Sequence, residues 1–132
     1  MANARGNIGT TNYAVAITAG HHHLTADEPP ALGGQAAGPA PFDLLCASLT
    51  ACTAITLRMY AERKGWPLTS VEVNVHFTAA NKDKGTAATI ERTLRFEGGL
   101  DVEQIARLAD IAERTPVTLT LKAGVPITTT VK

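Results

Sequence analysis

The spacing of apolar residues predicts one long helix over residues 41–64. Pro41 suits the first helical position, where the missing N–H needs no partner, and Asp43 lies in the first turn, where a carboxylate favours the helix dipole. Gly65 is a natural residue to end the helix. Polar side chains are scarce before Arg58, and a helix that is apolar on most sides is buried on most sides. We therefore expect a central helix, wrapped by a sheet or covered by a second subunit.

Alternation of apolar and polar residues predicts strands in the rest of the chain. Residues 70–79 alternate cleanly, and residues 89–97 return after a polar loop, which is typical of an antiparallel hairpin. Shorter strands are expected at residues 13–18, 21–25 and 125–131.

A second, amphipathic helix is expected to open at Asp101, because Asp101 and Gln104 have the spacing of a capping box. It should end before Pro116, since the residue preceding proline disfavours helical angles. Residues 117–121 fit either a short helical turn or an extended piece, and residues 1–11 a frayed or edge segment. The element order predicts a mainly antiparallel α+β fold in a single domain of residues 1–132.

Composition narrows the classes of protein that the chain can belong to. Its 132 residues are 45% hydrophobic, enough for one globular domain with a core. The 12 basic and 12 acidic residues balance, so nothing calls for nucleic acid or an anionic membrane as a partner. No apolar run reaches about 18 residues, which predicts no membrane span. The polar N-terminus lacks the core of a signal peptide, so we expect a cytoplasmic protein.

A motif around the long helix carries the clearest chemical signal. It reads Gly38-Pro39-Ala40-Pro41-Phe42-Asp43-Leu44-Leu45 and continues as Ala51-Cys52-Thr53-Ala54. With these residues, the run Leu100 to Gln104, the Pro116-Val117 step and the order of elements, the chain resembles the OsmC/Ohr family of osmotically inducible protein C and organic hydroperoxide resistance proteins. The resemblance implies an OsmC-like fold, in which antiparallel sheets pack around a long central helix in an intertwined homodimer with its site at the subunit interface.

The resemblance also implies a thiol chemistry. Catalytic members reduce hydroperoxides through a thiolate that becomes a sulfenic acid, and a second cysteine then forms a disulfide that a thiol donor reopens. Cys52 matches the first cysteine, and Asp43 lies where the family commonly has glutamate. Thr115 falls at the second, resolving cysteine, so the chain is a divergent member that lacks it. The family's assisting arginine has no match near residues 20–23.

Each of these residues also has a structural interpretation. Cys52 fits a small apolar core thiol, and Asp43 a stabiliser of the first helical turn. Lowering the pKa of a reactive cysteine requires a cation or hydrogen-bond donors, and Arg92, Arg58 or a histidine are the candidates for the cation. Arg92 fits equally well a residue at the sheet edge whose charge reaches water.

The remaining histidines and the other cysteine leave alternatives open. His21 and His23 share one face of a strand, so they fit metal ligands joined by His76, a plain polar strand, or a substitute for the missing arginine. Cys46 lies about 9 Å from Cys52 along the same helix, too far for a disulfide, which needs Cα atoms within about 7 Å. A pairing of Cys46 across a dimer axis stays open.

Two functions follow from these residues and from the resemblance. The leading hypothesis is a one-cysteine reductase of organic hydroperoxides that uses Cys52 and an external thiol reductant and serves in oxidative stress defence. The rival is a non-catalytic protein of the same fold that binds a small apolar ligand in the dimer-interface pocket. Neither hypothesis requires a cofactor or a metal.

Overall fold

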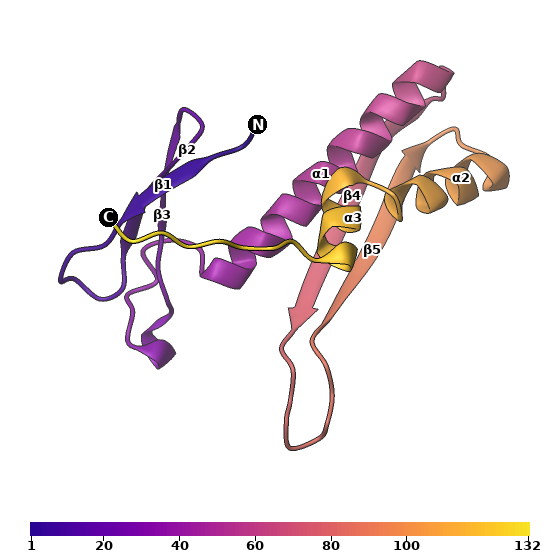
Figure 1. Cartoon of the computed structure of the whole chain (residues 1–132). Coiled ribbons are helices and arrows are strands. Elements are labelled where there is room, and N and C mark those ends of the chain that lie inside the picture. The colour runs from indigo at the N-terminus through magenta and orange to yellow at the C-terminus, as the bar shows by residue number, and fades with distance from the viewer. The chain divides into compact units, whose positions relative to one another are not determined.

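The computed structural model describes all 132 residues, which divide into two compact units, residues 1–45 and 46–132 (Figure 1). The long helix α1 (Pro41–Lys64) begins in the first unit, and most of its residues belong to the second. Its bounds are those that the sequence predicts. A single domain over residues 1–132 stays a prediction.

The first unit holds a three-stranded antiparallel sheet in the order β1-β2-β3. The strands are β1 (Ala4–Asn7), β2 (Val15–Ala19) and β3 (His22–Ala26), and a short 3-10 helix, η1 (Pro30–Leu32), follows. The two strands expected at residues 13–18 and 21–25 are confirmed. The N-terminal segment supplies the edge strand β1, with Gly6 opposite Ile17 of β2.

A buried carboxylate organises the loop between this sheet and α1. Asp27 is 2% exposed and accepts four backbone N–H groups, from Tyr13, Glu28, Gln35 and Ala37. Burial raises the pKa of the Asp27 carboxyl, but the four donors outweigh it and bring the pKa below its usual value. A side chain on Gly38 would collide with the carbonyl group of Thr25, which gives the motif glycine a steric reason. The path of the chain into α1 is therefore fixed by local contacts.

The second unit packs helices on the apolar face of a β-hairpin. The hairpin consists of β4 (Leu68–Thr78) and β5 (Thr89–Gly98), followed by α2 (Val102–Ala112) and α3 (Pro116–Ala123). Leu57 of α1 and Leu108 of α2 are fully buried at the centre of the core. The side chains packed around them come from both helices, both strands and the adjoining loops: Tyr60, Trp66, Val71, Leu94, Phe96, Leu100, Ile111 and Ala112.

Helix α1 has apolar residues on faces that no other part of the chain covers. Its buried residues follow one stripe, whereas Ile55 and Met59 are 55% and 54% exposed. An 18-residue window has a mean hydropathy of 1.4, so α1 could cross a membrane by length and composition alone. The prediction of no membrane span rests on unbroken apolar runs, none of which reaches about 18 residues, and it stays a prediction. The core helix of a soluble protein meets the same criterion.

The C-terminal part confirms one local prediction and corrects another. Both bonds of the capping box are present, because Asp101 accepts from the Gln104 N–H at 2.8 Å and Gln104 accepts from the Asp101 N–H at 3.0 Å. The undecided segment 117–121 lies within α3. The strand expected at residues 125–131 is wrong: this segment pairs with no strand, and Ile127 is 89% exposed. Alternation makes a strand only where a neighbouring strand offers hydrogen bonds.

Candidate functional site

The thiol of Cys52 lies at the beginning of helix α3. The Val117 backbone N–H donates to Cys52 Sγ across 3.5 Å, and Pro116 and Val117 open α3. The first N–H groups of a helix have no partner within it and form the positive end of its dipole. A hydrogen-bond donor directed at the sulfur is one of the groups that a reactive cysteine requires. The donor that a reactive Cys52 requires is therefore a backbone group, and Arg58 instead donates to the Leu68 carbonyl at 2.6 Å.

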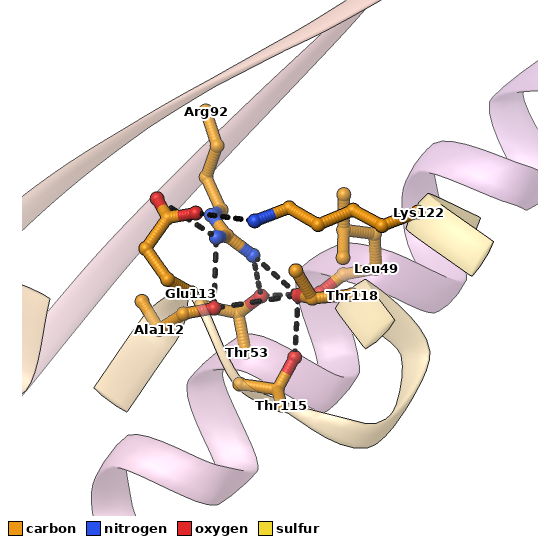
Figure 2. A network of polar contacts seen from close by, with 8 residues as sticks. All are labelled: Leu49, Thr53, Arg92, Ala112, Glu113, Thr115, Thr118 and Lys122. Atoms are coloured by element: carbon orange, nitrogen blue, oxygen red, sulfur yellow. Dashed lines mark hydrogen bonds and ion pairs between the residues drawn. The ribbon is translucent and has the colours of Figure 1, made fainter. Parts of the chain in front are cut away.

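Arg92 lies beside this site, on the apolar face of β5 and opposite Val75. Its side chain is 10% exposed, so the interpretation of a charge reaching water is wrong. One nitrogen, Nη1, donates to Thr53 Oγ1 at 3.0 Å and to Thr118 Oγ1 at 2.9 Å, and Nη2 donates to the Ala112 carbonyl at 2.8 Å (Figure 2). These three acceptors come from α1, α3 and α2. The guanidinium group therefore joins three helices from a position on the hairpin.

The carboxylate beside Arg92 is exposed. Glu113 Oε1 lies 3.7 Å from Arg92 Nη2, while Glu113 Oε2 accepts from Lys122 Nζ at 2.9 Å. The Lys122 hydrogen bond lowers the pKa of Glu113, burial opposes this, and the charges of Lys122 and Arg92 add to the lowering. Because Glu113 is 61% exposed, water screens its attraction for Arg92. The neutral oxygens hold the guanidinium group in place.

Three buried threonines complete the network. Thr53 donates its hydroxyl to the Leu49 carbonyl at 2.7 Å, which leaves its oxygen free to accept from Arg92. The hydroxyl oxygens of Thr115 and Thr118 lie 2.6 Å apart. No buried side-chain nitrogen or oxygen lacks a hydrogen-bond partner. The polar groups beside Cys52 therefore form a closed set, which is the condition under which a buried polar network is stable.

A pocket of about 450 Å³ opens on the same network within the second unit. Arg92, Glu113 and Lys122 supply its charges, and its apolar walls include Leu49, Phe77, Ile90 and Leu121. Its size lies within the range of small-molecule sites, which are apolar with a few convergent polar groups.

The other residues that the sequence singled out have local roles. Asp43 accepts from the Ala40 N–H at 3.0 Å, which fits a stabiliser of the α1 N-terminus. Asp43 belongs to the first unit and Cys52 to the second. A role of Asp43 at the thiol stays a prediction.

The histidines and cysteines bring no further cluster together. His23 Nδ1 is hydrogen-bonded to Thr18 Oγ1 at 3.1 Å, and His76 lies opposite Glu91 in the hairpin. The chain has no group of three or more His, Cys, Asp or Glu side chains placed to hold a metal ion. Cys46 and Cys52 are both free and half-buried.

Comparison with known proteins gives this arrangement a family. A family model described as OsmC-like protein matches residues 33–130, which is most of the chain. The chain belongs to the OsmC-like family. No curated protein matches the sequence.

Solved structures of low sequence identity share the fold. An OsmC-like protein from Mycoplasma pneumoniae aligns with a TM-score of 0.76 at 17% identity over 92% of this chain and 87% of its own. An organic hydroperoxide resistance protein OsmC from Legionella pneumophila gives 0.70 at 21% identity over 92% and 89%. The organic hydroperoxide resistance protein OhrB of Bacillus subtilis gives 0.59 at 23% identity over 91% and 90%. These likenesses establish the α+β OsmC-like fold, with its long helix and antiparallel sheets.

Sequence reasoning missed two parts of this OsmC-like site. Val117 was not considered as a donor, although the proline before it marks the first turn of a helix and could have indicated α3. Thr53 carried no signal, because a threonine within a helix most often bonds only to its own backbone. Its second bond joins it to Arg92, 39 residues away in the chain.

Proposed function

We propose that this OsmC-like protein reduces organic hydroperoxides through the thiolate of Cys52. The observation that carries the proposal is the contact between Cys52 Sγ and the Val117 N–H at the N-terminus of α3. The thiolate is the nucleophile in such reactions, and a hydrogen-bond donor at the sulfur is one of the groups that this chemistry requires. The two related structures named as organic hydroperoxide resistance proteins support the class of substrate.

The reaction consists of one oxidation step and two reduction steps. The thiolate attacks the distal oxygen of the hydroperoxide, the O–O bond breaks, and the alkoxide leaves as an alcohol after taking one proton from the medium. Cys52 is thereby oxidised to a sulfenic acid. One external thiol condenses with the sulfenic acid to a mixed disulfide and releases water, and a second external thiol exchanges with that disulfide, which regenerates Cys52 and gives the disulfide of the reductant.

The need for an external reductant follows from a threonine, Thr115, at the position expected for the resolving cysteine. A threonine lies where the family's resolving cysteine is expected, and its hydroxyl is engaged with Thr118. Cys46 precedes Cys52 on the same helix at a separation that excludes a disulfide within the chain. Organic hydroperoxides are preferred over hydrogen peroxide because the helix around Cys52 is so apolar.

We also propose that the chain acts as an intertwined homodimer. Ile55 and Met59 project from α1 more than half exposed, and a second copy of the chain would cover such a face. Proteins of this family are soluble, and we propose a cytoplasmic dimer in which α1 is the central helix rather than a membrane span.

Peroxide consumption by the purified protein tests the proposal. The assay uses cumene hydroperoxide with dithiothreitol and compares the wild type with Cys52→Ser and Cys46→Ser. We expect turnover that Cys52→Ser abolishes and Cys46→Ser retains, with a Cys52 sulfenic acid trapped by dimedone before the reductant is added. A wild type no faster than dithiothreitol alone, with Cys52 unmodified in the mass spectrum, refutes the proposal.

The rival function is binding of a small apolar ligand without catalysis. Thr115 favours it by removing half of the family's redox pair, and so does the pocket beside Arg92 with its apolar walls. The two functions separate in one experiment. A binding protein gives a ligand-dependent rise in melting temperature that persists in Cys52→Ser, and it shows no peroxide turnover.

A further inference from the structure

The Arg92 guanidinium group bridges Thr53 and Thr118, which are the next residues in the chain after Cys52 and Val117. Thr53 comes directly after Cys52, and Thr118 comes directly after Val117. A single nitrogen of Arg92 donates to both threonine hydroxyls, at 3.0 Å and 2.9 Å (Figure 2). The bridge from Thr53 through Arg92 to Thr118 therefore runs beside the contact between Cys52 Sγ and Val117 N, and both join α1 to α3.

An arginine at this position is unfavourable for packing alone. The residues of β5 two positions before and after Arg92, on the same face of the strand, are Ile90 and Leu94, and Leu94 packs against the core. An apolar residue in place of Arg92 would continue that apolar face. Burying a charge is destabilising unless it is paired and hydrogen-bonded, and a well-packed apolar residue is often as stable or more so. The carboxylate beside Arg92 is the exposed Glu113. The gain from Arg92 therefore lies in the helices that it holds together.

We propose that Arg92 is a positioning residue for Cys52. It holds the first turn of α3 against α1, so that the Val117 N–H stays directed at Cys52 Sγ. Thr53 and Thr118 act with it as the two acceptors, and the Ala112 carbonyl fixes the second nitrogen of the group. This inference rests on the proposed function for its catalytic meaning, whereas the positioning itself is measurable without peroxide.

Substitutions at Thr118 distinguish this bridge from ordinary packing. Thr118→Val keeps the shape of the side chain and removes the hydroxyl, which accepts from Arg92 and is also hydrogen-bonded to Thr115 Oγ1 and the Ala112 carbonyl. Thr118→Ser keeps the hydroxyl and these three bonds and removes a methyl group. The readout is the second-order rate of Cys52 oxidation by cumene hydroperoxide. We expect Thr118→Val to slow it about tenfold, the effect of one hydrogen bond to a charged group. Thr118→Ser should restore most of that rate.

Arg92→Gln and a matched control test the cation itself. Arg95 lies on the same strand, is 77% exposed and pairs with Glu72 at 3.6 Å, so Arg95→Gln removes an equal charge outside the network. Hydrogen exchange of the Val117 amide reports its hydrogen bond directly. In Arg92→Gln this amide should exchange at least about tenfold faster than in the wild type. This increase should exceed the increase in exchange of the Leu57 amide, which reports the global stability. In Arg95→Gln it should exchange as in the wild type.

The outcomes separate the two proposals. A Thr118→Val protein that keeps its rate while Thr118→Ser loses it overturns the bridge in favour of packing. Val117 exchange that is the same in Arg92→Gln and the wild type overturns it as well. A wild type inert toward peroxide refutes the proposed function. In that case, two measurements still test whether Arg92 positions Cys52: hydrogen exchange of the Val117 amide and the rate at which a reactive disulfide labels Cys52. A change of both in Arg92→Gln supports the proposal.

Discussion

Replacing Thr115 by cysteine tests whether the chain keeps the geometry of a two-cysteine enzyme. Thr115 is the residue directly before the first turn of α3, and two residues later the Val117 N–H reaches Cys52 Sγ at 3.5 Å. The family resemblance implies that a cysteine at position 115 would face Cys52. We therefore expect Thr115→Cys, in a Cys46→Ser background, to form a disulfide with Cys52 on mild oxidation.

The size of the effect follows from the loop that the disulfide closes. Residues 52 and 115 enclose roughly 60 residues, and a loop of that length loses about 4 kcal/mol of unfolded-state entropy when it is cross-linked. For a chain of 132 residues, 1 kcal/mol corresponds to about 3–4 °C in melting temperature. The oxidised variant should therefore melt on the order of 10–15 °C above its reduced form, if strain is small. Comparing two redox states of one variant removes the lost bond between Thr115 and Thr118, about 1 kcal/mol, from the difference.

Thermal unfolding by circular dichroism, with and without reductant, measures this difference, and thiol titration counts the free cysteines. The control is the same variant with Cys52→Ser, in which the introduced cysteine has no partner within its chain, so it should melt at one temperature in both states. If both thiols of the Thr115→Cys protein stay free after treatment with a mild oxidant, the correspondence between Thr115 and the resolving position is refuted. That result would also remove the main argument for an external reductant.

Three further predictions concern the parts of the fold that support the site. Leu57→Ala should lower the free energy of unfolding by about 2–5 kcal/mol in urea melts, because Leu57 is fully buried in the core cluster. Ile55→Asp should convert the proposed dimer to a monomer in analytical ultracentrifugation, since it places a charge on the exposed apolar face of α1. A variant that stays dimeric would exclude that face as the interface. Asp27→Asn should lower stability at neutral pH. Because the folded pKa of Asp27 is lowered, its stabilisation is present above the usual value of 3.8 and lost as the pH falls through the folded pKa. The variant should therefore lose less stability than the wild type on acidification below that value, and equal acid sensitivity of the two would contradict the role of Asp27.

Local signals in the sequence predict most of the helices and strands but not the contacts between them. Helix α1 is correctly bounded because Pro41 and Gly65 are terminal signals that act within one turn. The segment 125–131 has a strand pattern of the same quality, but a strand depends on a partner that no local pattern specifies. The interpretation of Arg92 as a residue at the sheet edge fails for a related reason. Its acceptors Thr53 and Thr118 lie 39 and 26 residues away in the chain, so only the folded structure brings the three together.

In the proposed cycle Thr115 stands where the family resemblance implies a resolving cysteine, and this changes which step limits the rate. A cysteine at position 115 would bond to the sulfur of Cys52 in every turnover, so the start of α3 would take part in the reduction. Here Thr115 is fully buried and bonded to Thr118, which Arg92 holds in turn, so that segment is fixed. A fixed first turn of α3 keeps the Val117 N–H directed at the sulfur during the attack on peroxide. The sulfenic acid can then be reduced only by a thiol from solution. Since Cys52 is only half-buried, reduction then depends on how well the thiol fits the site. In the proposed mechanism, the rate of oxidation is therefore set by the network around Arg92, and the rate of reduction by the size and shape of the external thiol.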